Sequence, residues 1–309
     1  FLKERKLAKL YYNWDKREVR DRYHKSPYFY SDDILSLPTH NKKWVCFDEI
    51  HKMPKWKNIL KDFHDTEKGK IRFIITGSAR LDLLRKSGDS LAGRYFLFHL
   101  FPVSLRELVS PVRHTGRLMQ KPEKDGVSFV EKSIGEPKYR QNGLDLLLKF
   151  SGFPEPLSLA KENLYKMWQN NYLDAVLKED LRDISGVRNL ENVAKLFTIL
   201  PTKIGSPLSI NSLINDVEVS YPAIKNYLYL LELGYLIFKI SPYTRKITRS
   251  IKKEKKYYFF DWTRVEDLSF RFENYVAFEL FNLITFWKDN GFGNFELYFV
   301  RNRNGQETD

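Results

Sequence analysis

Short apolar runs separated by charged or helical stretches dominate the first third of the chain. They cover residues 8–14, 44–47, 71–75 and 94–100. Such runs are too short for a free-standing helix face, but they suit strands that are buried on both faces of a parallel sheet. Between the second and third runs, apolar residues recur at helical spacing: Trp56, Ile59, Leu60 and Phe63. Strands that alternate with helices predict right-handed crossovers and a parallel α/β sheet.

Two adjacent acids, Asp48 and Glu49, directly follow the second apolar run. In open parallel sheets, ligands bind at the carboxyl ends of the strands. A first carboxylate there can hold Mg²⁺, directly or through water, and a second can polarise an attacking water. The alternative is an ordinary strand followed by a helix, whose first turn favours acids because of the helix dipole. The two acids alone do not decide between these interpretations.

Small polar residues follow the third apolar run. Thr76 and Ser78 would then lie beside the acidic pair and could contact a γ-phosphate or the attacking water. Arg80 and Arg94 are candidate charge-stabilising cations. The alternative is a β-to-α turn that uses Gly77 and a serine cap. Two neighbouring strands that end in complementary polar chemistry favour a nucleotide site.

Composition adds a charge argument to this picture. The chain holds 52 Lys and Arg against 39 Asp and Glu, which gives a net charge of +13. That excess favours a polyanionic partner such as DNA, although a basic protein with a solvated lysine-rich surface is the alternative. The single cysteine, Cys46, excludes a disulfide framework and fits a reducing, cytoplasmic compartment. No apolar run approaches the length of a membrane span, so we expect no membrane partner.

The middle of the chain reads as a loop followed by helices. Residues 111–140 are charged and rich in Gly and Pro, which predicts a poorly ordered or long-loop insertion. Residues 141–200 predict a helical lid with helices near 143–150, 164–181 and 190–200. Arg182, at the charged end of the second helix, could sense nucleotide in the same subunit or in a neighbouring subunit of a homo-oligomer. We favour the alternative, an ion pair on a wet surface.

Residues 201–265 predict a winged-helix domain. A short helix at 208–214 is followed by a helix that Ser220 caps and Gly234 ends, and then by strands at 235–240 and 256–261. The loop between the strands is basic and suits phosphate contacts; its cations include Arg245, Lys246, Arg249, Lys252 and Lys253. The second helix lacks an arginine that could read guanine. Binding to the nucleic-acid backbone, or plain domain packing, is therefore favoured over sequence-specific reading.

Three stretches of sequence carry a family resemblance. They are FDEIHKMP at 47–54, ITGSARLDLL at 75–84 and SLAGRYFLFHLFPVSLREL at 90–108. The chain resembles prokaryotic AAA+-superfamily ATPases that carry a C-terminal restriction-endonuclease-like domain of unknown function. The resemblance implies a P-loop-type parallel sheet over residues 1–110, with ATP and Mg²⁺ as ligands. It also implies that Asp48 binds Mg²⁺, that Glu49 is the catalytic base, and that Thr76 or Ser78 is the sensor residue.

One element of that family pattern is missing from these residues. The phosphate loop, G-x-x-x-x-G-K-[ST], should precede the first strand, and we expect the chain to begin after it. The stretch from Gly88 to Tyr95 has the glycine spacing, but it offers Arg94 and Tyr95 where a lysine and a small hydroxyl are needed. Without backbone N–H groups to cradle the phosphates, we expect these 309 residues alone not to hydrolyse ATP.

Residues 266–309 predict the start of an α/β nuclease-like domain, with a helix that bears Glu273 and a hairpin that ends at Asp309. The resemblance to PD-(D/E)xK nucleases implies that these two acids are metal ligands. Because the remaining half of that motif is expected after Asp309, we expect no active nuclease here; a helix and hairpin with surface acids is the alternative. Our hypothesis is that the chain is part of an ATP-hydrolysing protein, and that its ATPase activity is coupled to DNA binding or to the nuclease-like domain. The rivals are a non-catalytic nucleic-acid-binding module and a protein-interaction scaffold.

Overall fold

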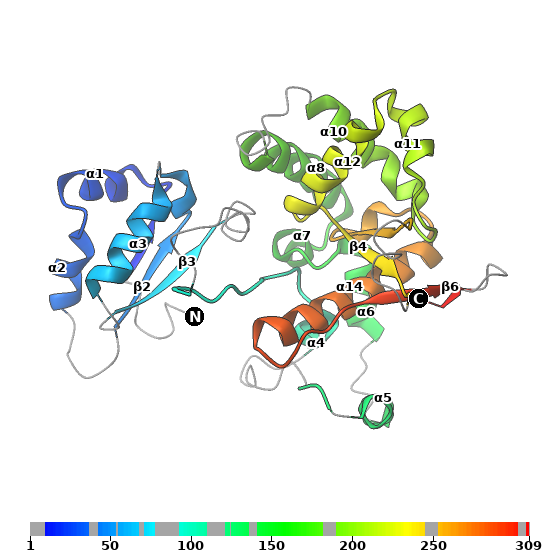
Figure 1. Ribbon diagram of the computed structural model, residues 1–309, viewed down its shortest axis with the longest axis horizontal. Helices are drawn as coiled ribbons and strands as arrows, with labels where there is room; N and C mark the ends of the chain where they lie inside the picture. Colours follow the sequence, from blue (N-terminus) through cyan, green and yellow to red (C-terminus); the bar gives the residue numbers. More distant parts are fainter. Residues whose placement is uncertain are drawn as a thin grey trace. The chain divides into compact units, whose positions relative to one another are not determined.

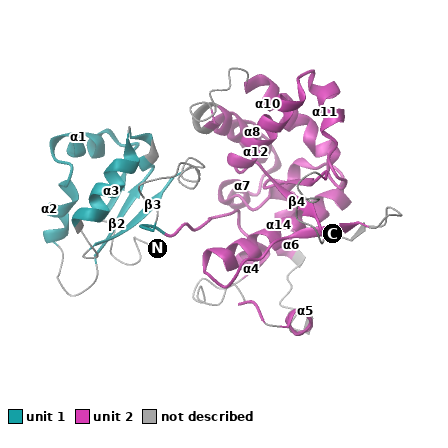
Figure 2. Ribbon diagram, viewed as in Figure 1, with its two compact units in different colours: residues 1–95 teal, residues 96–309 magenta. Residues whose placement is uncertain are grey.

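The computed structural model divides the chain into two compact units, Phe1–Tyr95 and Phe96–Asp309 (Figure 2). Each unit has its own cluster of buried apolar side chains. The structure describes the following residues: 10–36, 43–53, 55–67, 71–77, 93–109, 121–123, 125–135, 141–181, 190–244, 253–301 and 307–308.

Unit 1 is built on a parallel sheet, which confirms the α/β prediction for this region. Its strands lie in the order β1 (Tyr11–Asn13), β2 (Lys43–Asp48) and β3 (Ile71–Thr76). The helical elements are α1 (Arg17–Lys25), α2 (Phe29–Leu35), the 3₁₀ turn η2 (Ile50–Lys52) and α3 (Trp56–Glu67) (Figure 1). The central strand β2 buries Val45, Cys46 and Phe47, as expected for a strand covered on both faces.

Aromatic rings join the helices of unit 1 to its sheet. Phe63 of α3 lies 5.4 Å from Phe47 of β2 and 6.0 Å from Phe73 of β3, measured between ring centroids. Tyr30 of α2 lies 4.9 Å from Phe63 and 5.7 Å from Phe47. Aromatic pairs at these separations stabilise a core beyond the area that they bury. The packing fixes β2 between its neighbours.

The strand register of unit 1 decides which polar side chains share an edge. Asn13 of β1 is paired with Asp48 of β2, and Asp48 is paired with Thr76 of β3. These residues are the last of their strands. The carboxyl edge of the sheet therefore carries an amide, a carboxylate and a hydroxyl side by side.

Unit 2 begins with helices. In chain order the helical elements are α4 (Leu105–Val109), α5 (Gly126–Gly135), α6 (Gln141–Phe150), α7 (Pro154–Leu159), α8 (Glu162–Ala175), the π-helical turn η5 (Val176–Leu181), α10 (Leu190–Ile199) and the 3₁₀ turn η6 (Leu200–Lys203) (Figure 1). The three helices predicted between residues 141 and 200 are present. The one predicted over 164–181 continues as η5 after Ala175.

The second half of unit 2 mixes helices with a four-stranded sheet. Its elements are α11 (Ile210–Val217), α12 (Tyr221–Leu233), β4 (Ile237–Pro242), β5 (Lys256–Phe259), the 3₁₀ turn η7 (Trp262–Arg264), α14 (Leu268–Asp289), β6 (Tyr298–Arg301) and β7 (Glu307–Thr308). The strand order is β5-β4-β6-β7; β4 pairs antiparallel with β5 and parallel with β6, and β6 pairs antiparallel with β7. The predicted pairing of the two wing strands is confirmed.

The cap predicted at the start of α12 is also present. The Ser220 side chain accepts a hydrogen bond from the backbone N–H of Ala223, and the helix ends at Leu233, one residue before Gly234. Pro222 lies in the first turn, where a missing N–H removes no intrahelical bond. Local capping chemistry was therefore a reliable guide to this helix.

The prediction of a strand over residues 94–100 is wrong. Residues 95–100 form no strand, and the side chains of Phe96, Phe98 and Leu100 are 89%, 62% and 97% exposed. The backbone N–H of His99 donates instead to Asp289 Oδ2 at 2.8 Å. A short apolar run favours a buried strand, but a strand also needs a neighbour to pair with.

The prediction of a loop over residues 111–140 is also wrong in part, because α5 lies within that range. Asp125 begins this helix. Its carboxylate accepts from the backbone N–H of Val127 at 3.1 Å and from the Ser128 hydroxyl at 2.6 Å. An acidic side chain at that position satisfies N–H groups that the helix leaves unpaired. The loop prediction rested on the glycines and prolines of the insertion and did not include this cap.

Candidate functional site

Asp48 is the centre of the polar edge of unit 1. Its Oδ1 accepts a hydrogen bond from the Thr76 hydroxyl, and its Oδ2 accepts one from the Tyr11 hydroxyl. The Asn13 amide nitrogen lies 3.5 Å from the same Oδ2. The hydrogen bond to the carboxylate raises the pKa of Tyr11 to about 12. Side chains from both neighbouring strands therefore orient the Asp48 carboxylate.

Glu49 follows the end of β2 in a left-handed conformation, with φ 59° and ψ 26°. Its backbone N–H donates to the Thr76 carbonyl at 3.0 Å, which extends the pairing with β3 by one residue. For a residue other than glycine this conformation costs on the order of 1 kcal/mol, and such strain concentrates at functional sites. The side chain is mostly covered, and burial raises the pKa of its carboxyl, against a smaller lowering effect of Lys52.

Lys52 connects two carboxylates at this edge. Its ammonium nitrogen lies 2.6 Å from Asp15 Oδ1 and 3.5 Å from Glu49 Oε2. Among the described residues, Lys52 pairs with Asp15 and Glu49, and Asp48 has no ion pair. The described residues of the site therefore combine one lysine with three acids.

Four residues of this edge were not predicted from the sequence: Tyr11, Asn13, Asp15 and Lys52. A signal existed for the first two. They lie two positions apart on a predicted strand, so they share one face and reach the same sheet edge as Asp48. Lys52 is three residues after Glu49, and three residues make one turn of a 3₁₀ helix. No pattern in the sequence predicts such a turn here.

Arg94 does not join Asp48 and Glu49. Its Nε lies 3.1 Å from Asp65 Oδ1, near the C-terminal end of α3. Helix α3 connects the carboxyl end of β2 to the amino end of β3. Its C-terminal end therefore lies near the amino ends of the strands, at the other edge of the sheet from Thr76. The proposed role of Arg94 as a nucleotide-binding cation receives no support from this placement.

Several predicted site residues lie outside the described part of the chain. They are Ser78, Arg80, Arg182, Arg245, Lys246, Arg249, Lys252 and Asp309. Lys253 is described and is exposed. The nucleic-acid contacts assigned to this basic loop stay predictions.

Glu273, the predicted helix acid of a nuclease site, lies on α14 and contacts β5. Its Oε1 lies 3.2 Å from the ammonium of Lys256, which is 1% exposed, and accepts from the Tyr258 hydroxyl at 2.8 Å. This geometry gives Glu273 a structural partner. Within the described ranges, no three His, Cys, Asp or Glu side chains form a group that could hold a metal ion. The metal role of Glu273 stays a prediction, since Asp309 is not described.

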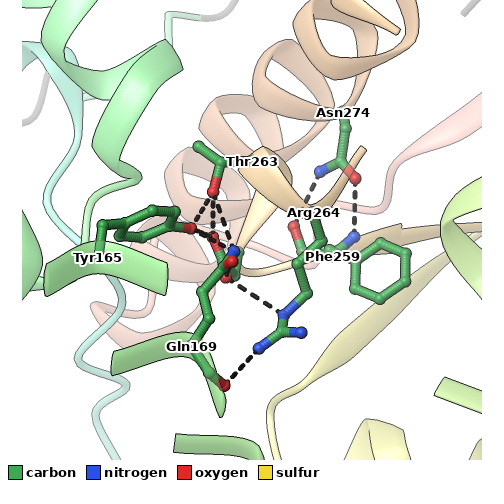
Figure 3. Close-up of polar contacts among 7 residues, drawn as sticks. Tyr165, Gln169, Phe259, Thr263, Arg264 and Asn274 are labelled. Carbon is green, nitrogen blue, oxygen red and sulfur yellow. Dashed lines mark hydrogen bonds and ion pairs between the residues drawn. The ribbon is translucent and has the colours of Figure 1, made fainter. Parts of the chain in front are cut away.

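A second polar cluster lies inside unit 2, around Asp261 (Figure 3). The Asp261 carboxylate accepts from the Tyr165 hydroxyl at 2.5 Å, the Gln169 amide at 2.8 Å and the Thr263 hydroxyl at 2.7 Å. Arg264 Nε lies 3.2 Å from Asp261 Oδ2. The cluster joins α8 to the turn after β5 and contains its own counter-ion, which suits a structural role.

Comparisons with known proteins assign two regions of the chain. Residues 1–109 match the family described as "AAA domain", and residues 141–263 match the family described as "Domain of unknown function (DUF8612)". The AAA match contains every residue of the polar edge around Asp48. The match suggests an ATPase-family protein.

The similar curated proteins carry no functional name. The uncharacterized protein MJ1544 of Methanocaldococcus jannaschii is 27% identical over 72% of this chain and 48% of its own length. An uncharacterized protein of Haemophilus influenzae is 24% identical over 73% of this chain and 52% of its own length. The chain thus spans about half the length of the curated relatives it matches.

Two further findings complete the comparisons. No solved structure matches the chain significantly. Of the helices that the structure describes, none combines the length and apolar character that crossing a membrane requires.

Proposed function

We propose that unit 1 supplies the metal-holding and water-activating side of an ATPase site. Asp48 holds Mg²⁺ and Glu49 is the general base. The observation that carries this proposal is the Asp48 carboxylate: hydrogen bonds from Tyr11 and Thr76 orient it at the carboxyl edge of a parallel sheet, and in the described structure it has no ion pair. The match of residues 1–109 to an AAA domain supports the same interpretation.

The donor set at this edge fits Mg²⁺. That ion prefers oxygen ligands and keeps several of its waters, so one or two carboxylates are enough to hold it beside a phosphate chain. The oxygens available here are the Asp48 carboxylate and the Thr76 hydroxyl, because the Asn13 amide oxygen already accepts from the backbone N–H of Asp15 at 2.7 Å. When bound, Mg²⁺ would offset the negative charge of the phosphates. The two donors lie at the ends of the adjacent strands β2 and β3, which holds them in a fixed arrangement.

Glu49 is suited to take a proton from water. In this proposal the water oxygen bonds to the γ-phosphorus, the bond from that phosphorus to the ADP oxygen breaks, and the water proton passes to the Glu49 carboxylate. Burial raises the pKa of that carboxyl, which makes the carboxylate a better base. The Thr76 hydroxyl, and Ser78 two residues later, would orient the water or the γ-phosphate.

The test uses the full-length protein that contains this chain. We expect Glu49→Gln to lower kcat for Mg²⁺-dependent ATP hydrolysis by at least about 100-fold, because a positioned general base contributes 10²–10⁴-fold. ATP affinity should change by less than about threefold, since the substitution keeps the shape of the side chain. Asp21→Asn, at an exposed acid of α1, is the matched control. Equal turnover by the Glu49→Gln variant and the parent would overturn the proposal.

Coupling of this site to nucleic acid is a further part of the hypothesis. It rests on the net charge of +13 and on the order of α11, α12, β4 and β5, which is that of a winged helix. Assembly into a homo-oligomer rests on Arg182 alone. Both stay predictions, as does the rival of a scaffold that keeps the ATPase fold without turnover.

A further inference from the structure

We infer that Lys52 is the positioning residue of this site: it fixes the direction of the Glu49 carboxylate, and Asp15 anchors it. The inference rests on the proposed function, because it assigns Glu49 a role that depends on direction. It concerns a lysine and an aspartate to which neither the AAA match nor the sequence motifs gave a role.

Three segments of unit 1 meet at the Lys52 ammonium. Asp15 follows β1, Glu49 follows β2, and Lys52 itself ends η2. The ammonium has three hydrogens, so one group can serve Asp15 at 2.6 Å and Glu49 at 3.5 Å together. The two contacts tie the ends of adjacent strands to the turn that follows the acidic pair.

The backbone holds Lys52 in register with Glu49. The N–H of Lys52 donates to the carbonyl of Glu49 at 3.1 Å, which closes the 3₁₀ turn. Side chains three residues apart in such a turn lie on the same side. The left-handed conformation of Glu49 starts that turn, so the strain at Glu49 and the position of Lys52 have one backbone cause.

A base at this position needs such a restraint. Glu49 lies beside two further acids, Asp48 and Asp15, which repel its carboxylate. A glutamate also has three rotatable bonds, so ordering its side chain costs conformational entropy. The Lys52 ammonium beside Glu49 Oε2 restricts this freedom and offsets the repulsion. Asp15, at the shorter distance, keeps that cation in place when Glu49 moves.

The interaction is too exposed to be explained by stability. The side chains of Lys52 and Asp15 are 42% and 50% exposed, and ion pairs in that setting contribute little to folding. A positioning role therefore predicts a loss of turnover without a loss of fold. It also predicts that substrate affinity is kept, because the ammonium is engaged by carboxylates rather than directed at phosphate.

The first experiment measures ATP hydrolysis by the full-length protein. We expect Lys52→Met to lower kcat about tenfold, the scale of a misaligned catalytic group, with KM for ATP changed by less than about twofold. Lys52→Arg should recover most of the activity, because a cation of similar reach remains. Asp15→Asn should lower kcat by a smaller factor. Lys25→Met, at an exposed lysine of α1, is the matched control.

A double substitution separates this inference from the function on which it rests. If Lys52 acts through Glu49, Lys52→Met should cause no further loss in a Glu49→Gln background. An equal further loss there, unchanged kcat in the single variant, or a raised KM with unchanged kcat would each overturn the inference. Equal turnover by Glu49→Gln and the parent would instead overturn the proposed function. Thermal unfolding checks that each variant folds, and Asp15→Asn tests the anchor should Lys52→Met fail to fold.

Discussion

Two aspartates, one in each unit, have the same hydrogen-bond partners by type and different surroundings. Asp48 in unit 1 has the hydroxyls of Tyr11 and Thr76 and the amide of Asn13 around it. Asp261 in unit 2 accepts from Tyr165, Thr263 and Gln169. In each case a tyrosine, a threonine and a side-chain amide gather on one carboxylate at the end of a strand or just after it.

The two carboxylates differ in how deeply they are buried and in whether a cation lies beside them. Asp261 is 4% exposed and has Arg264 at 3.2 Å, whereas Asp48 is only partly covered and has no ion pair in the described structure. Hydrogen bonds orient a carboxylate, but they do not neutralise it. A carboxylate that is oriented and also neutralised has a structural role, because it connects the elements that carry its partners. One that is oriented and left negative at a sheet edge is suited to receive a cation from outside the chain.

The largest expected effect is on stability. Asp261→Ala should lower the free energy of unfolding of unit 2 by about 3–5 kcal/mol, because it leaves the mostly buried Arg264 without its counter-ion. Asp48→Ala should lower the stability of unit 1 by less than about 1 kcal/mol. Urea denaturation followed by circular dichroism measures both. Equal losses at the two sites would show that the comparison is mistaken.

A smaller effect should separate the two tyrosines. Tyr165→Phe removes a buried hydroxyl from a charged acceptor and should lower stability by about 1.5–3 kcal/mol. Tyr11→Phe removes a hydroxyl from a side chain that is 41% exposed, and water can replace it, so its effect should stay below about 0.5 kcal/mol. The same denaturation measurement applies. A Tyr11 variant that loses as much as the Tyr165 variant would contradict the assignment of Asp48 to an open site.

The smallest effect concerns a third carboxylate, Glu279 of α14, which is covered but has no ion pair in the described ranges. It accepts from the backbone N–H of Leu105 and from the Tyr275 hydroxyl, each at 2.8 Å. Burial raises the pKa of its carboxyl; nearby Glu107 adds to the rise and Arg106 opposes it. The folded state therefore holds the proton more tightly than the unfolded state.

The sign of the resulting pH dependence follows from that raised pKa. The contribution of Glu279 to stability is fully present below the unfolded-state pKa of about 4.3 and is lost as the pH rises through the folded-state value. Glu279→Gln keeps an acceptor oxygen without a charge. We expect it to flatten the stability curve between acid and neutral pH and to be the more stable form at neutral pH. A parallel displacement of the whole curve would argue against this role.

The site was predictable where strand direction alone decides position. Asp48 and Thr76 were placed together because the carboxyl ends of parallel strands meet at one edge, and the register confirms that placement. The tie from Lys52 to Asp15 could not be predicted, since it joins residues 37 positions apart in sequence. The left-handed conformation of Glu49 could not be predicted either, because glutamate does not favour it.

The same limit explains the misses elsewhere. The apolar run of residues 94–100 predicted a strand, but pairing needs a partner that the segment does not specify. The cluster around Asp261 joins α8 to residues more than ninety positions later, so no local pattern contains it. The hairpin of β4 and β5 and the helix from Ser220 to Gly234 were predicted well, because caps and adjacent strands are local.

The parallel pairing of β4 with β6 has a consequence for dividing this gene into pieces. Ser241 and Pro242 pair with Tyr298 and Phe299, so β5 and β4 form one continuous sheet with β6 and β7. A shortened protein that stops at residue 265 would lose α14 and β6, leave Ser241 and Pro242 of β4 without their strand partner, and remove Phe299 from the core. Such an uncovered strand invites pairing with other molecules. The β4–β5 hairpin and the segment after it are therefore best expressed as one piece.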